Sequence, residues 1–189
     1  MAVLRRDEYA LRPIEERDLD TVLGWRNSER IRVNMYTDHE ITFDEHHEWF
    51  ARLQKEPVPT FMILEFQGRP IGVIQVTQID RRNNKCHWGF YIGDPGAPPG
   101  SGTALGYLGL NYIFDVLKIR KLCAEAFVFN SASVKYHKRL GFIEEGCLVK
   151  HILKNGRYED IVSFALFEED WVRHRMRIEE LYFSKGGPG

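Results

Sequence analysis

A loop of glycines and prolines runs directly into a long apolar pattern over residues 94–117, DPGAPPGSGTALGYLGLNYIFDVL. From Gly102 onward, apolar residues recur at intervals of three and four, which predicts an amphipathic helix. The first N–H groups of a helix have no intrahelical acceptor, and the helix dipole adds a partial positive charge there. Because the glycines carry no side chain, this helix start suits a phosphate or a pyrophosphate. A flexible loop ahead of a core helix is the alternative interpretation.

The rest of the chain alternates short strands and helices. Thr42 and Glu45 form a capping box before one helix, Gly141 is placed to end another, and Asn155-Gly156 is a strong hairpin signal. The expected order is a strand, two helices, three strands, the glycine-loop helix, a strand, a helix and two strands. This order predicts an α/β (α+β) fold with a mixed, mainly antiparallel sheet of about seven strands and helices on both faces.

Composition limits the class of protein. The 189 residues are 43% apolar and include 26 basic and 27 acidic residues, which predicts an ordered globular chain with no surface for nucleic acid or membrane. We expect an N-terminal extension over 1–8, one domain over 9–171, and a C-terminal helical extension with a mobile tail over 172–189. The three widely spaced cysteines form no CxxC pair, and the first residues lack the apolar core of a signal peptide. Both features predict a cytoplasmic protein.

Two common phosphate-binding motifs do not fit the glycine loop. The Walker A motif requires a Lys after its last glycine, and the dinucleotide fingerprint requires a third glycine where this chain has Leu105. The pattern GxGTA at residues 100–104 instead resembles motif A of the GNAT superfamily of acyl-CoA N-acyltransferases. Ala97 stands where that motif usually has Gln or Arg, a change that leaves the backbone N–H groups untouched.

A second segment, FNSASVKYHKRLGFIEEG at residues 129–146, strengthens the resemblance. In the family, a strand ends in Asn, and the next helix has a small residue three positions later and Gly-Phe at its end. The resemblance extends from residue 11 to about residue 171 and implies the GNAT fold with acetyl-CoA as the cofactor. It also implies that the backbone N–H groups of residues 90–92 stabilise the oxyanion. The implied cofactor-binding residues are Phe90, Tyr91, Ile92, Gly100, Ser101, Gly102, Thr103, Ala104, Asn130 and Ser133.

The candidate catalytic residues are Glu125, His137 and Tyr136. Strand alternation places Glu125 on one face with Cys123, Phe127 and Phe129, where it is a candidate general base or a partner in a salt bridge. Many family members have a Tyr facing the thioester sulfur at the position of His137, so the resemblance implies that His137 protonates the leaving thiolate. A surface His137 beside a core Tyr136 is the alternative. Transfer is expected by direct attack in a ternary complex.

The residues ahead of the central strands are candidates for binding the acceptor amine. Arg26 and Arg30 are four residues apart, so they are expected either to clamp a diphosphate or to form a solvated helix face. The stretch is similar to the UDP-amino-sugar N-acetyltransferases of pseudaminic acid biosynthesis. This similarity implies acetylation of the 4-amino group of a UDP-linked sugar in an apolar pocket. The implied substrate-binding residues are Arg26, Arg30, Met35, Tyr36, Thr77 and Tyr91.

Other functions stay open from the sequence. They are a ribosomal-protein N-terminal acetyltransferase, an aminoglycoside acetyltransferase and a non-catalytic acyl-CoA-binding module. His39, His46 and His47 invite a metal interpretation, but without an HExxH pattern we expect a solvated helix start and no metal. The expected partner is a small-molecule amino-sugar nucleotide, with a homodimer left open.

Overall fold

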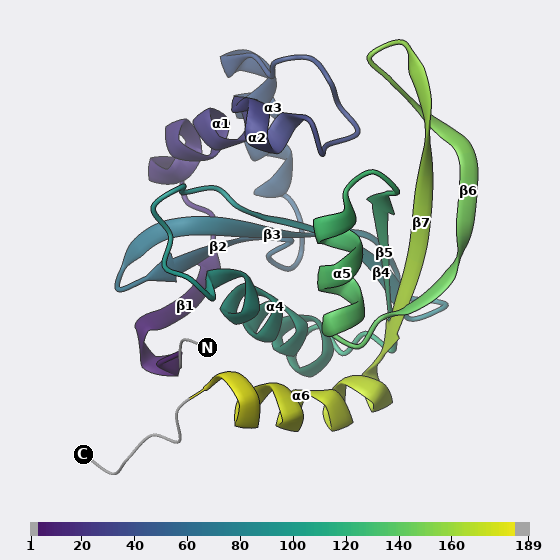
Figure 1. The fold of residues 1–189 in the computed structure, drawn as a ribbon. Helices are drawn as coiled ribbons and strands as arrows, with labels where there is room; N and C mark the ends of the chain where they lie inside the picture. The colour runs from purple at the N-terminus through teal and green to yellow at the C-terminus, as the bar shows by residue number, and fades with distance from the viewer. Residues whose placement is uncertain (1–3, 184–189) are drawn as a thin grey trace.

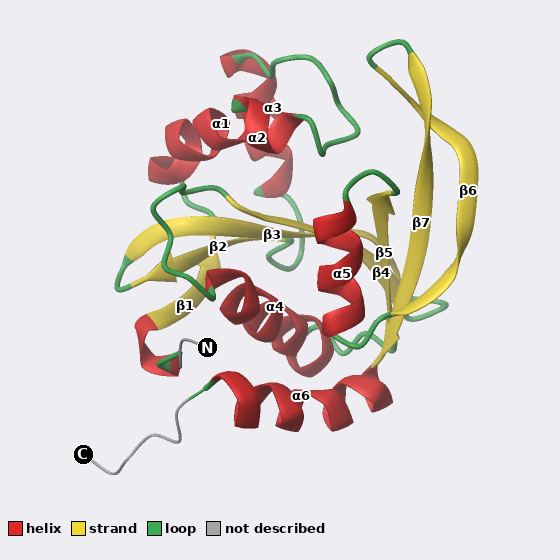
Figure 2. Ribbon diagram, viewed as in Figure 1, coloured by secondary structure: helices red, strands yellow, loops and turns green. Residues whose placement is uncertain are grey.

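The computed structural model describes residues 4–183, and within them seven strands form one sheet in the order β1-β2-β3-β4-β5-β7-β6 (Figure 2). Among these described strands every neighbouring pair is antiparallel except β4 and β5, which run parallel. The predicted mixed, mainly antiparallel sheet is confirmed. The strands are β1 (Tyr9–Pro13), β2 (Phe61–Phe66), β3 (Arg69–Asp80), β4 (Lys85–Ile92), β5 (Lys121–Phe127), β6 (Ile143–Lys154) and β7 (Arg157–Phe167).

Helices cover both faces of the sheet, as predicted (Figure 1). Ile63 and Val73 pack in one core with residues of α1 and α3, whereas Leu64 and Ile74 pack in a second core with α4. These strand neighbours alternate between the two cores because successive side chains of a strand point to opposite faces. The helices are α1 (Leu19–Asn27), α2 (Glu29–Arg32), α3 (Phe43–Leu53), α4 (Ser101–Asn111), α5 (Ser131–Arg139) and α6 (Glu168–Tyr182), with a π-helical turn (Tyr112–Val116) after α4 and short 3₁₀ turns at Arg6–Glu8 and Glu16–Asp18.

Three local sequence signals are confirmed. The Thr42 hydroxyl accepts a hydrogen bond from the Glu45 N–H at 3.2 Å, and the Glu45 carboxylate accepts one from the Thr42 N–H at 2.7 Å. Asn155 and Gly156 have positive φ angles of 48° and 76°, as a tight hairpin turn requires. Gly141 ends α5 with a φ of 92°.

A break in the N-terminal helical region separates the two arginines that were expected to share a helix face. Ser28 has the non-helical angles φ −58° and ψ 139°, and its hydroxyl donates to the Trp25 carbonyl at 2.6 Å. The first helix therefore ends before Ser28, and a new short one begins after it. The expectation that Arg26 and Arg30 lie on one helix face was wrong.

The sheet opens between β4 and β5. Residues 85–87 of β4 pair with residues 121–123 of β5, and in the described chain no pairing between the two strands continues beyond them. β4 continues along β3 as far as Ile92, while β5 continues along β7 as far as Phe127. The separation leaves the edge of β4 beyond His87 without a strand partner on its β5 side.

Both flanking segments pack onto the domain. Leu4 is 5% exposed and belongs to the main core, as do Trp171 and Ile178 of α6. The domain boundaries stay a prediction, and the tail at 184–189 lies outside the described residues. Within residues 4–183, no helix is both long enough and apolar enough to cross a membrane.

Candidate active site

A cavity of about 550 Å³ lies where β4 and β5 separate. Its walls come from β3, β4, β5, α4, α5 and the segment that follows α2, so it joins distant parts of the chain. It brings together most of the predicted site residues, namely Met35, Tyr36, Thr77, Phe90, Tyr91, Ile92, Gly102, Glu125, Asn130, Ser133, Tyr136 and His137.

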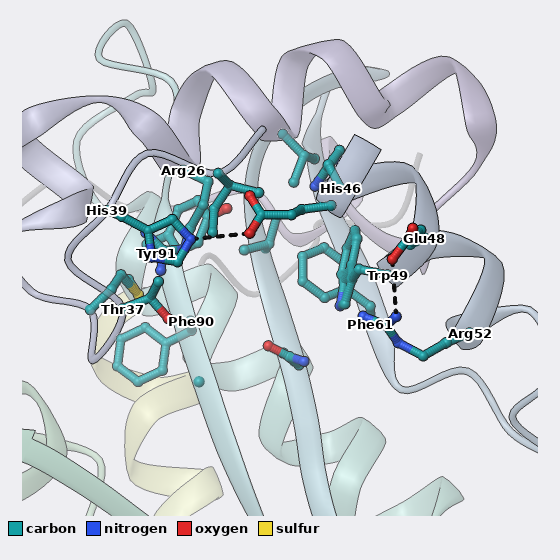
Figure 3. A pocket seen from close by; sticks show the side chains of 17 residues that line it. Arg26, Thr37, His39, His46, Glu48, Trp49, Arg52, Phe61, Phe90 and Tyr91 are labelled. Carbon is teal, nitrogen blue, oxygen red and sulfur yellow. Dashed lines mark hydrogen bonds and ion pairs between the residues drawn. The ribbon is translucent and has the colours of Figure 1, made fainter. Parts of the chain in front are cut away.

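A second cavity of about 440 Å³ lies beneath α1 and α3 (Figure 3). It shares Met35 and residues 89–91 of β4 with the first cavity, so the two are adjacent along this strand. Trp49 and Phe61 give it aromatic walls, and the predicted residue Arg26 lies in it. We refer to the cavity between β4 and β5 as the transfer cavity and to this one as the acceptor cavity.

The glycine loop begins α4 in the manner expected for an anion site. Gly100 caps the helix with a φ of 95°. The N–H groups of Ser101, Thr103 and Ala104 donate to the carbonyls of Pro98 and Gly100. In the described part of the chain, the N–H groups of Gly100 and Gly102 have no acceptor. Two free donors on residues without side chains fit the pyrophosphate of coenzyme A.

Tyr136 fastens α5 to the start of α4. Its hydroxyl donates to the Gly102 carbonyl at 2.6 Å, and its ring lies 4.8 Å from that of Phe90. A Cβ atom added at Gly106 would lie 2.5 Å from the hydroxyl oxygen, so the close contact requires glycine there. Burial raises the pKa of Tyr136 above its ordinary value, which keeps the phenol protonated. These contacts give Tyr136 a packing role.

His137 is buried, at 2% exposure, rather than at the surface. Its Nδ1 lies 2.8 Å from the Ser133 carbonyl oxygen, and its Nε2 lies 3.3 Å from the indole N–H donor of Trp88. The ring also stacks on Phe164 at 5.1 Å. Burial lowers the pKa of His137 to about 4. A neutral imidazole whose Nε2 accepts a hydrogen bond has no proton to give to a thiolate, so the expected acid role is not favoured by this geometry.

Glu125 faces the transfer cavity, and its carboxylate accepts a hydrogen bond from the Tyr36 hydroxyl at 2.5 Å. The Tyr36 ring lies edge-on to Phe127 at 5.4 Å. Among residues 4–183, Glu125 forms no salt bridge, and its Oε1 atom has no hydrogen-bond donor. One carboxylate oxygen is thus left facing a space where an amine can bind.

Three further predicted site residues, Asn130, Ser133 and Thr77, also line the transfer cavity. The Asn130 side chain accepts from the Ser133 N–H at 3.1 Å and so caps α5. Thr77 pairs with His87 across β3 and β4, and both line the cavity. His87 was not predicted as a site residue. In the sequence it alternates with apolar neighbours, as many residues of a half-buried strand do, so nothing marks it out.

Arg30 holds the end of β4. Its guanidinium donates to the carbonyls of Ile92 at 3.0 Å and Gly93 at 2.6 Å. Position 93, whose carbonyl accepts one of these hydrogen bonds, requires glycine because an added Cβ would lie 2.1 Å from the Trp25 ring. The side chain predicted to bind a diphosphate is therefore occupied by backbone carbonyls.

Lys154 contacts the acceptor side of the site from the tip of the β6–β7 hairpin. Its Nζ donates to the carbonyls of Met35 at 2.6 Å and Arg32 at 3.3 Å. The next residue, Asn155, donates its N–H to the Asp38 carboxylate at 3.2 Å. Sequence reasoning missed Lys154 because these contacts join segments more than a hundred residues apart.

Two of the three histidines considered for a metal site, His39 and His46, line the acceptor cavity. His46 is buried and stacks on Trp49 at 4.8 Å, so the expectation of a solvated helix start was wrong for it. His39 lies 3.3 Å from Glu45 at the rim. The described residues contain no group of three His, Cys, Asp or Glu side chains arranged for a metal ion.

Residues 9–143 match the acetyltransferase (GNAT) domain family model. The chain belongs to this family. This acetyltransferase is 24% identical to a spermidine N(1)-acetyltransferase of Vibrio cholerae, over 87% of this chain and 96% of the relative. It is also 24% identical to an L-amino acid N-acetyltransferase of Escherichia coli, over 84% of this chain and 97% of the relative.

The fold of the acetyltransferase is similar to a crystal structure of spermidine N-acetyltransferase from Vibrio cholerae in complex with CoA and spermine. The TM-score is 0.81 at 22% identity, over 88% of this chain and 99% of the other. The GNAT assignment makes the protein an acetyl-CoA-dependent N-acetyltransferase, with acetyl-CoA as co-substrate.

Proposed function

We propose that this acetyltransferase acetylates a primary amine on a small molecule that also carries an anionic group, and that the acceptor is an amino sugar linked to a nucleoside diphosphate. Its 4-amino group, as implied by the sequence resemblance, is the site of transfer. The observation that carries the proposal is a set of cations beside the acceptor cavity, which we call the cation cluster: the half-buried Arg26 and Arg32 and the buried Lys154.

The only carboxylates near the cation cluster in the described chain, Asp38 beside Lys154 and Glu40 beside Arg32, are both exposed. The Nη1 atom of Arg26 and the Nε atom of Arg32 are buried without a hydrogen-bond partner among the described residues. Burial lowers the pKa of Arg26, and the nearby charge of Arg32 lowers it further. Burial likewise lowers the pKa of Lys154; the Asp38 carboxylate opposes this shift, and the charges of Arg26 and Arg32 add to it. Glu40 approaches Arg32 only to 3.8 Å and is largely exposed.

Buried charges without partners destabilise a protein unless a ligand supplies the opposite charge. A diphosphate provides two anionic groups, and a guanidinium binds phosphate through two parallel hydrogen bonds. The aromatic walls formed by Trp49, Phe61 and Tyr91 provide apolar surface for a sugar or a base. A diphosphate-linked amino sugar would neutralise the cation cluster with its diphosphate and would pack its sugar or base against the aromatic walls.

A polyamine is the second candidate, since a similar protein and a similar solved structure are both named for spermidine. Glu45 and Glu48 line the acceptor cavity and give it acidic groups. His39 lies 3.3 Å from Glu45, however, and Arg52 lies 3.9 Å from Glu48 (Figure 3). With these partners and the cation cluster nearby, a polycation gains little attraction here.

The test is thermal unfolding with UDP or spermidine, followed by mass spectrometry after incubation with acetyl-CoA and a panel of amines. The panel contains a UDP-linked 4-amino sugar, spermidine, an aminoglycoside and a peptide with a free N-terminus. We expect UDP to raise the melting temperature because a ligand of the native state stabilises it by mass action. Arg26→Gln should remove this shift, whereas Arg17→Gln, an exposed control paired with Glu15, should keep it. Acetylation of spermidine with no UDP stabilisation would overturn the proposal.

A further inference from the structure

We propose that Tyr36 is a catalytic residue of this acetyltransferase, giving its hydroxyl proton to the departing thiolate and recovering a proton from Glu125. The inference rests on acetyl transfer itself and not on the identity of the acceptor. It therefore holds for any amine that the enzyme acetylates.

The first support is the position of Tyr36. Its hydroxyl lies 2.5 Å from Oε2 of Glu125, and both residues line the transfer cavity. The edge-on contact with Phe127 holds the ring, and the Lys154 contact holds the carbonyl of the preceding residue, Met35. The hydroxyl is therefore fixed beside the carboxylate, yet the residue is 43% exposed and open to the cavity.

The second support is the acceptor of each neighbouring proton donor: Tyr136 and His137 donate to backbone carbonyls, whereas the Tyr36 hydroxyl donates to the candidate base. The Tyr136 hydroxyl donates to the Gly102 carbonyl at 2.6 Å, and a Cβ at Gly106 would already crowd it. His137 uses Nδ1 at the Ser133 carbonyl and accepts the Trp88 N–H at Nε2. Of these three side chains, only Tyr36 is hydrogen-bonded to a group that can return a proton to it after transfer.

The proposed proton path is balanced. The amine nitrogen attacks the thioester carbonyl carbon, a C–N bond forms, and Oε1 of Glu125 takes a proton from that nitrogen. Protonation at Oε1 makes Oε2 a weaker acceptor and releases the Tyr36 hydroxyl. The C–S bond then breaks, and the sulfur takes the proton of that hydroxyl. Rotation of the Glu125 carboxyl group returns the amine proton to the Tyr36 oxygen. One proton has moved from nitrogen to sulfur, and both side chains regain their starting states.

The test compares Tyr36→Phe with Tyr158→Phe, which removes an exposed hydroxyl from β7. With an amine from the panel that is turned over, Tyr36→Phe should lower kcat by about 100-fold, a value within the range for general acid–base catalysis. Calorimetric affinity for coenzyme A should be unchanged, and Tyr158→Phe should match the wild type. An unchanged kcat in Tyr36→Phe would overturn the proposal.

A fluorinated tyrosine at position 36 separates proton transfer from simple positioning. It keeps the hydrogen bond to Glu125 but has a more acidic phenol, so kcat should gain an alkaline limb within the accessible pH range. A pH profile that keeps the wild-type form would show that Tyr36 only positions Glu125, and the proposal would fail. As a readout without turnover, the ¹⁹F resonance should titrate at lower pH after Glu125→Gln, because the carboxylate no longer opposes phenol ionisation. Absence of that shift would also count against the pair.

Discussion

The ammonium group of Lys154 lies 2.6 Å from the carbonyl oxygen of Met35, across 119 residues of sequence. Lys154 is 5% exposed and also reaches the Arg32 carbonyl, so the hairpin tip holds the segment that carries Tyr36. The segment that we propose to bind the acceptor is thereby linked to a hairpin that contributes no residue to the predicted coenzyme site.

Replacing Lys154 by Met should weaken acceptor binding and spare coenzyme binding. A hydrogen bond from a charged donor is worth about 1.5–3 kcal/mol, so KM for the acceptor should rise about 10-fold or more while KM for acetyl-CoA stays constant. Steady-state kinetics with each substrate varied in turn would measure this. Lys150→Met on the exposed part of the same strand is the matched control. An equal rise in both KM values would contradict the expected role.

A large side chain at Gly102 should abolish coenzyme binding. A Cβ at this position meets only Tyr136, at 3.8 Å, so the fold has room for the first atom of the new side chain. The indole of Gly102→Trp would cover the two free N–H groups at the start of α4. Calorimetry with coenzyme A should show no binding, while Gly24→Trp, at an open position on α1, should bind normally. Binding retained by Gly102→Trp would place the pyrophosphate elsewhere.

Features set by adjacent residues were predictable, and contacts between distant segments were not. The Thr42–Glu45 capping box and the Asn155-Gly156 turn were predictable because each is specified by residue types within four positions of one another. The shared helix face of Arg26 and Arg30 was wrong because a spacing of four residues does not by itself exclude a break at Ser28. The Tyr36–Glu125 contact joins positions 89 residues apart, and no local pattern specifies such a pair.

The buried His137 should make stability fall as the solution is acidified. Its folded-state pKa is about 4 against an ordinary 6.5, so between these values the unfolded chain binds a proton that the folded chain does not. The stabilisation is complete above pH 6.5 and is lost as pH falls toward 4. From pH 7 to pH 5 the loss should be about 2 kcal/mol. Urea unfolding should show this slope in wild type and in the exposed-residue control His151→Gln. The slope should be reduced in His137→Gln, and an equal slope there would contradict a neutral buried imidazole.

Asp18 should stabilise the link between β1 and the first helices. Its carboxylate accepts two hydrogen bonds from Arg12, at 2.6 Å and 2.8 Å, and one from the Glu15 N–H at 2.8 Å. Burial alone would raise the pKa of Asp18, but these hydrogen bonds outweigh it and hold the pKa below its usual value. Asp18→Asn should cost about 3–5 kcal/mol at pH 7, as breaking a buried pair does. Because the depressed pKa stabilises the fold only while the group is ionised, the cost measured by denaturation should shrink at pH 3. Asp20→Asn, on an exposed position of α1, should have little effect.

The hydrogen bonds from Lys154 also govern when the acceptor site is completed during synthesis. Residues 33–41 leave the ribosome long before the hairpin that holds them, and domains of this size fold largely as units. Contacts between residues far apart in the sequence are expected to form late. Closing such a long loop costs conformational entropy, and the contacts of the rest of the sheet must first offset that cost. Until then the new chain can build the glycine-loop helix but not the wall that carries Tyr36. The segment that carries Tyr36 can therefore gain its contacts with Lys154 only after the β6–β7 hairpin has been synthesised.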